Sequence, residues 1–166
     1  MILSTKGRYA VMAMVDLAAH QQDKPIGLAA IADRQEIPLA YLEQIFAKLK
    51  RAGLVQSSRG PGGGYKLACP ATEIPVVSII AASEEAIKMT RCAEHSHAGC
   101  MADKTRCMTH DLWEGLGQQI YGYLRDITLD DIVARRIRDK FPRDPQAQPH
   151  ATLFAQLAEQ GTSLAG

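Results

Sequence analysis

The sequence lacks a long apolar run and an export signal. No stretch approaches the roughly 18 consecutive apolar residues that a membrane-spanning helix needs. Residues 1–6 lack the basic region followed by an apolar run that marks a signal peptide. We therefore expect no membrane partner and a cytoplasmic location, where thiols stay reduced. We therefore interpret the cysteines as metal ligands or buried thiols before disulfides. There are four of them: Cys69, Cys92, Cys100 and Cys107.

The sequence also has little net charge and no catalytic arrangement. Lys and Arg total 19 against 18 Asp and Glu, for a net charge of +1, whereas nucleic-acid-binding proteins are usually basic overall. Outside residues 92–110 there is no Ser/His/Asp or Cys/His set, and no nucleotide-binding fingerprint is present, so we do not expect an enzyme. The 166 residues, 46% hydrophobic and 22% charged, are typical of a folded globular protein.

The near-neutral sum combines two halves of opposite charge. Residues 1–72 carry nine Lys and Arg against five Asp and Glu, a net of +4, and residues 73–166 carry a net of −3. Between Lys48 and Lys66 there are five basic residues and no acidic one. Because a whole-chain sum cannot detect charge clustered on one face, the low net charge does not exclude DNA as a partner.

The first half predicts helices and then a glycine-rich hairpin. Apolar residues on nearly every side predict a helix over 4–21, and a short apolar set at 28–32 precedes a turn at 35–38. The next helix, opened by Pro38 and closed by Gly53, has one buried stripe at helical spacing, formed by Leu42, Ile45, Phe46 and Leu49. Two strands, 54–58 and 65–68, flank the segment 59–64. That segment lacks the lysine and Ser/Thr of a P-loop, so we interpret it as a hairpin tip rather than a phosphate cradle.

Helix, turn, helix and basic hairpin are the parts of a winged helix-turn-helix, whose second helix enters the DNA major groove. Taken alone, that helix would be an ordinary solvated surface helix; the order of the parts favours DNA binding. Gln44 can pair with adenine, and Glu43 can accept from cytosine N4. Phosphate contacts are expected from four basic residues: Lys48, Arg51, Arg59 and Lys66. We expect double-stranded operator DNA to be bound by Tyr41, Glu43, Gln44, Lys48, Arg51, Arg59, Gly60, Gly62 and Gly63.

Residues 92–110 contain a possible metal-binding set. Seven residues separate Cys92 from Cys100, six separate Cys100 from Cys107, and two separate Cys107 from His110. Three thiolates and one imidazole suit zinc or an iron–sulfur cluster, whereas magnesium prefers oxygen ligands. Spacing alone leaves zinc, iron–sulfur and no metal open, because only the last two residues have the close pairing of structural zinc sites. A histidine ligand would raise the reduction potential of a [2Fe-2S] cluster, which suits a sensor. His95 and His97 are possible substitute ligands, and Cys69 lies apart.

The remaining sequence predicts a helix over 74–87 that starts at Pro75, a long helix capped by Thr109, and a short helix capped by Thr128. The apolar stripe of the long helix is either core within one subunit or a dimer interface; it comprises Leu112, Trp113, Leu116, Ile120, Leu124 and Ile127. Beyond about residue 136 we expect a flexible tail. The predicted domains are thus a DNA-binding domain over 1–72, a cluster loop with dimerisation helices over 73–136, and a tail over 137–166.

Four segments together resemble the IscR family of winged-helix, iron–sulfur-sensing transcription regulators: residues 3–11, 41–46, 59–65 and 107–113. The resemblance covers about residues 1–136. It implies a homodimer that holds one [2Fe-2S] cluster per subunit through Cys92, Cys100, Cys107 and His110, and that represses cluster-assembly genes in the cluster-bound form. It also implies that Glu43 discriminates between two operator classes. The chain departs from the family in its longer cysteine spacings and in Ala40, where serine is frequent.

We therefore expect a mainly α fold with a small β-hairpin wing, in which a winged helix-turn-helix is joined to a long dimerisation helix. The expected function is that of an iron–sulfur-cluster-sensing, DNA-binding regulator of iron–sulfur cluster assembly genes. A nitric-oxide- or iron-responsive regulator of the same family is one alternative. An iron–sulfur electron-transfer protein and a winged-helix repressor with structural zinc are the others.

Overall fold

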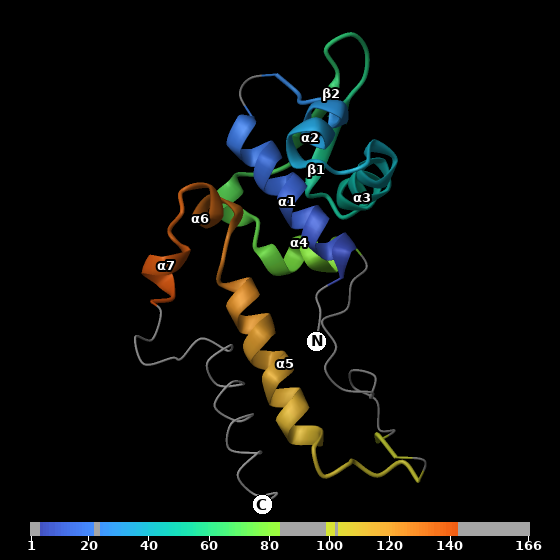
Figure 1. Ribbon diagram of the computed structural model, residues 1–166, viewed down its shortest axis with the longest axis vertical. Helices are drawn as coiled ribbons and strands as arrows, with labels where there is room; N and C mark the ends of the chain where they lie inside the picture. The colour runs from blue at the N-terminus through green and yellow to red at the C-terminus, as the bar shows by residue number, and fades with distance from the viewer. Residues whose placement is uncertain (1–3, 22–23, 84–98, 102, 143–166) are drawn as a thin grey trace, which may run out of the picture. The chain divides into compact units, whose positions relative to one another are not determined.

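The chain folds into helices and one hairpin, seen here in a computed structural model that describes residues 4–21, 24–83, 99–101 and 103–142 (Figure 1). The elements are α1 (Thr5–His20), α2 (Leu28–Gln35), α3 (Leu39–Arg51), β1 (Val55–Ser58), β2 (Gly64–Leu67), the 3-10 turn η1 (Ala71–Glu73), α4 (Val76–Ala82), α5 (His110–Arg125), α6 (Leu129–Val133) and α7 (Ile137–Lys140). Residues 1–135 form one compact unit, and residues 136–166, which include α7, form a second.

Helix α1 is the centre of the first unit and packs against α2, α3, α4 and α6. The Ser4 hydroxyl caps it by accepting a hydrogen bond from the Gly7 amide at 3.2 Å, and helix formation over 4–21 is confirmed. In α3, the predicted stripe is fully buried in the same core: Leu42, Ile45, Phe46 and Leu49. Gly53 follows α3 with a φ of +75°, as expected for a left-handed glycine that closes a helix.

The predicted hairpin is also confirmed. Strands β1 and β2 pair antiparallel from Val55 opposite Leu67 to Ser58 opposite Gly64. Tyr65 exchanges two backbone hydrogen bonds with Ile26, at 2.8 and 2.9 Å, and so ties the segment before α2 to the hairpin. Local sequence patterns did not predict this additional pairing of Ile26 with Tyr65, because the two residues lie about forty positions apart along the chain.

The segments before α4 and after α5 are paired with each other. The Val76 amide donates to the Ile127 carbonyl at 2.9 Å, and the Leu129 amide donates to the Ile74 carbonyl at 3.0 Å. Thr128 and Asp131 form the predicted capping interaction at the start of α6. Helix formation after Pro75 is confirmed over Val76–Ala82; residues 84–98, which include Cys92, His95 and His97, lie outside the described residues. Helices α4 and α6, which follow residue 72 in the sequence, thus pack on α1 together with the helices that precede it.

Helix α5 differs from the expectation in one respect. It ends at Arg125, so Ile127 is not part of its stripe; Ile127 is buried beside the start of α4 instead. On α5 itself only His110 is buried, and Leu112, Trp113 and Leu116 are 63%, 43% and 37% exposed. This part of the stripe is therefore not core within one subunit. Among the described residues, no helix has both the length and the apolar character needed to cross a membrane.

Candidate functional site

The recognition-helix candidate α3 presents its polar face to solvent. Glu43, Gln44 and Arg51 are exposed, and Lys48 is half-buried. These side chains lie opposite the buried stripe because residues three or four positions apart share one face of a helix. Tyr41 is half-buried, and its ring meets that of Tyr9 on α1 edge-on, with 5.7 Å between ring centroids. The first turn of α3 is thereby held against α1.

The tip of the hairpin requires glycine. Gly60 and Gly62 have φ values of +97° and +77°, where a side chain is strained. A Cβ on Gly63 would approach the carbonyl oxygen of Ser58 to 2.5 Å. Arg59, Gly60 and Gly62 are exposed and Gly63 is half-buried. The backbone can thus approach a ligand closely beside a basic side chain.

A hydrogen bond joins the recognition helix to the wing. Lys50 Nζ on α3 donates to Ser57 Oγ on β1 at 2.6 Å. Sequence reasoning did not assign a role to either residue, although Lys50 lies in the acid-free stretch. The contact favours a defined angle between α3 and the hairpin, which are the two elements expected to touch DNA.

Two of the predicted metal ligands lie in contact. Cys100 Sγ is 3.0 Å from His110 Nδ1. His110 is 5% exposed and begins α5, and its backbone amide donates to the carbonyl of Cys107 at 3.0 Å. Cys107 Sγ lies 3.6 Å from Thr109 Oγ1. Thr109 is in the predicted cap position, but its side chain forms no capping hydrogen bond. Cys92 lies outside the described residues.

A compact turn accommodates the long spacing between Cys100 and Cys107. The Gly99 amide donates to the Lys104 carbonyl at 3.0 Å, and the Met101 amide donates to the Thr105 carbonyl at 3.1 Å. Lys104 has a left-handed φ of +66°, and a Cβ on Gly99 would collide with Thr105. Hydrogen bonds from the Thr105 hydroxyl and amide lower the pKa of Asp103 below its ordinary value. The turn thus fixes the backbone on both sides of Cys100.

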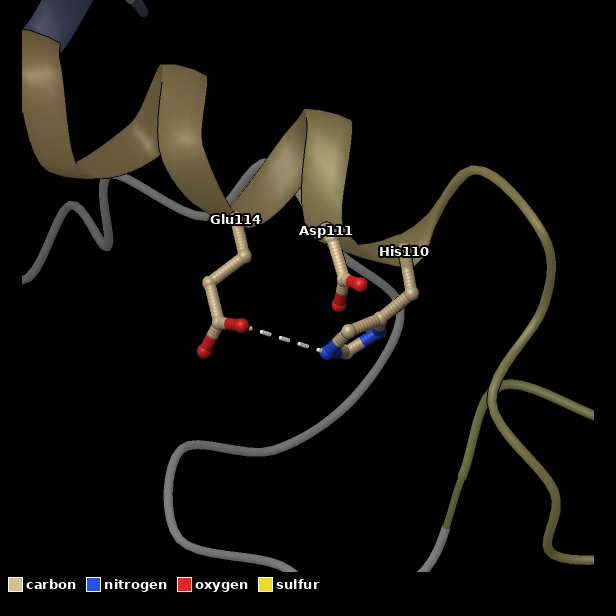
Figure 2. A group of neighbouring side chains, drawn as sticks. All are labelled: His110, Asp111 and Glu114. Carbon is tan, nitrogen blue, oxygen red and sulfur yellow. Dashed lines mark ion pairs between the residues drawn. The ribbon is translucent and has the colours of Figure 1, made fainter.

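Two carboxylates lie beside His110, and sequence reasoning missed both. Ligand atoms of His110, Asp111 and Glu114 lie within 4.8 Å of one another (Figure 2). His110 Nε2 is 3.6 Å from Glu114 Oε2. The sequence signal for the contact with Glu114 is its i, i+4 spacing from His110 on a helix. Cys69, by contrast, packs against the core, and among the described residues no disulfide joins Cys69, Cys100 and Cys107.

A helix-turn-helix with a hairpin wing defines the class of winged-helix DNA-binding proteins. The chain belongs to the Rrf2 family, described as "Iron-dependent Transcriptional regulator", whose pattern it matches over residues 3–135. It is 50% identical over 163 residues to an "HTH-type transcriptional regulator IscR" of Photobacterium profundum, and the match covers 98% of this chain and 93% of that protein.

Solved structures show the same fold. The IscR of T. potens is 34% identical with a TM-score of 0.66, covering 87% of this chain and 94% of the other. CymR, "the Global Cysteine Regulator of B. subtilis", is 31% identical with a TM-score of 0.66, covering 81% and 98%. The expected fold class is confirmed by these structures. The family and the relatives show that the chain is a DNA-binding transcription regulator and not an enzyme. It is similar to the IscR proteins, a class that senses iron–sulfur status.

Proposed function

We propose that this chain is a cytoplasmic, homodimeric regulator that carries a [2Fe-2S] cluster on Cys92, Cys100, Cys107 and His110 and controls cluster-assembly genes. The observation that carries the proposal is the contact between Cys100 Sγ and His110 Nδ1 at the start of α5. Thiol sulfur and imidazole nitrogen are the two kinds of atom that would bind iron in the proposed set of three cysteines and one histidine, and here one of each lies in contact.

The donor geometry fits a metal centre. Ligand atoms about 2.3 Å (sulfur) and 2.1 Å (nitrogen) from a tetrahedral metal ion lie roughly 3.6 Å apart. Cys100 Sγ and His110 Nδ1, which are 3.0 Å apart, would need to separate by about 0.6 Å. The sulfur atoms favour an iron–sulfur cluster over a hard cation on the nearby carboxylates. When bound, the cluster would supply a redox-active and labile iron centre, so that its presence reports cluster supply.

The cluster loop continues directly into the proposed dimer helix. His110 is both a proposed ligand and the first residue of α5. Ordering of residues 92–110 would therefore affect the start of α5 and, through the dimer, the spacing of the two α3 helices. In the bound complex we assign base contacts to Glu43 and Gln44, with Glu43 discriminating between operator classes. Phosphate or backbone contacts are assigned to the other predicted residues, Tyr41, Lys48, Arg51, Arg59, Gly60, Gly62 and Gly63.

The test is anaerobic purification of the full chain, with absorption spectroscopy and analysis for iron, sulfide and zinc. We expect equal amounts of iron and sulfide in the wild type and in Cys69→Ala, the matched cysteine control, and loss of both in Cys100→Ala, Cys107→Ala and His110→Ala. Operator binding is then compared with and without the cluster. Colourless protein that cannot be reconstituted, or stoichiometric zinc, would overturn the proposal. Loss of DNA binding on nitric oxide treatment alone would favour the nitric-oxide-responsive alternative.

A further inference from the structure

The two ring nitrogens of His110 face different chemical groups. Nδ1 is 3.0 Å from Cys100 Sγ, and Nε2 is 3.6 Å from a carboxylate oxygen of Glu114. Figure 2 shows the Glu114 side chain extending from the next turn of α5 toward the far edge of the imidazole. Sulfur thus lies on one side of the ring and negative charge on the other.

The helix makes this arrangement persistent. Residues at i and i+4 lie on the same helix face, so α5 keeps Glu114 next to a ring that is itself buried. The Glu114 side chain is 47% exposed, so a small rotation of it can shorten the 3.6 Å separation to a hydrogen bond of about 2.8 Å. The adjacent carboxylate of Asp111 is exposed and forms no ion pair with the ring in Figure 2.

The neighbours of the ring decide which nitrogen carries the proton. A neutral imidazole has one N–H and one lone pair, and an ionised carboxylate can only accept. A proton on Nε2 is therefore favoured by Glu114, and this tautomer directs the lone pair of Nδ1 at Cys100. Only a nitrogen with a free lone pair can bind iron.

We propose that Glu114 is a positioning residue that holds His110 in the Nε2–H tautomer, so that Nδ1 is the ligand atom. This inference rests on the proposed cluster site. Carboxylates that accept from the second nitrogen of a ligating histidine fix the ring and make it a stronger ligand. Glu114 would therefore increase the retention of the cluster without touching iron.

The first arm of the test is ¹⁵N NMR of histidine in the full cluster-free chain, in alkaline buffer where free imidazole is neutral. We expect the Nε2–H tautomer of His110 in the wild type, in E114Q, which keeps an acceptor oxygen, and in D111A, which removes a neighbouring charge only. We expect a mixture of tautomers in E114A. An Nδ1–H tautomer in the wild type, or an unchanged tautomer in E114A, would overturn the proposal.

The second arm measures the loss of the reconstituted cluster to a chelator. E114A should lose it about 10- to 100-fold faster than the wild type, with D111A close to the wild type and E114Q in between. Equal rates in E114A and D111A would overturn the role of Glu114 in retention. If no variant and not even the wild type binds a cluster, the proposed function fails, and the NMR result still judges the effect of Glu114 on the tautomer.

Discussion

At the scale of single residues, Asp16 joins α1 to α2. Its buried carboxylate accepts hydrogen bonds from Arg34 Nε at 3.0 and 3.1 Å, from Arg34 Nη2 at 2.5 Å and from Gln35 at 2.8 Å. Burial alone would raise the pKa of Asp16, but the hydrogen bonds from Arg34 and Gln35, together with the attraction of the guanidinium, lower it below the ordinary value of 3.8. The ionised form is thus the one that the fold stabilises.

Replacing Asp16 by asparagine should destabilise the fold. Removing one partner of a buried pair costs about 3–5 kcal/mol, and because the Arg34 side chain is 35% exposed we expect a smaller loss, about 2–3 kcal/mol at pH 7. Because the folded-state pKa is lowered, the wild-type stabilisation is present above the unfolded value and disappears as the pH falls through the folded one. The difference from D16N, measured by urea unfolding, should therefore shrink from pH 7 to pH 2.

The control is Asp33→Asn, which removes the same charge from an exposed position on α2. It should change the free energy of unfolding by less than about 0.5 kcal/mol. An equal effect of D33N and D16N would show that net charge, rather than the buried contact, sets the stability.

At the scale of elements, two glycines have opposite roles. A Cβ on Gly64 would collide with the backbone of Ile26 and so oppose the pairing of Ile26 with Tyr65. Around Gly115, within α5, a Cβ would meet open space. The wing therefore depends on the absence of a side chain, whereas α5 does not.

Alanine at these two positions should shift stability in opposite directions. Gly64→Ala should lower the free energy of unfolding by about 1–3 kcal/mol, because backbone must move to relieve the overlap. Gly115→Ala should raise it by about 0.5–1 kcal/mol through better helix propensity. Thermal unfolding followed by circular dichroism measures both. A G64A variant as stable as the wild type would contradict the close approach to Ile26.

At the scale of the whole molecule, the exposed apolar face of α5 predicts self-association. Leu116→Glu places a charge in the stripe, whereas Gln118→Glu places it on the opposite, exposed face and is the matched control. We expect L116E to raise the dimer dissociation constant about 100-fold or more, because each dimer contains the substitution twice. Light scattering over a concentration series measures it. Equal dimerisation of L116E and Q118E would exclude this face as the interface.

The charge of the first half predicts the salt dependence of DNA binding. If Lys48, Arg51 and Arg59 each neutralise one phosphate in both subunits, the slope of log K against log salt concentration is about −5. Arg59→Ala should reduce its magnitude by about 2, whereas Arg125→Ala, which removes the partner of Asp126 at the end of α5, should leave it unchanged. Fluorescence anisotropy with operator DNA at several salt concentrations tests this. A slope near zero would contradict the binding of phosphates by Lys48, Arg51 and Arg59.

Much of the fold could be predicted because its determinants are local. The stripe of α3, the left-handed Gly53, the glycine tip of the wing and the Thr128 cap each follow from residues a few positions apart. The candidate ligands Cys100, Cys107 and His110 could be proposed for the same reason, since all three lie in one short segment, residues 100–110. Local patterns failed at Ile127, because its pairing with the start of α4 competes with the continuation of α5.

Patterns along the chain were enough to predict the parts of a winged helix-turn-helix, the charge difference between the two halves and the donor types of the candidate metal centre. Three features came to light in the folded chain alone: Ile26 pairs with the hairpin, Arg34 contacts the buried Asp16, and Cys100 and Glu114 lie on opposite edges of His110. The physical reason is that helical and turn preferences depend on neighbours along the chain. Contacts between distant residues depend on how the buried faces of several helices fit together.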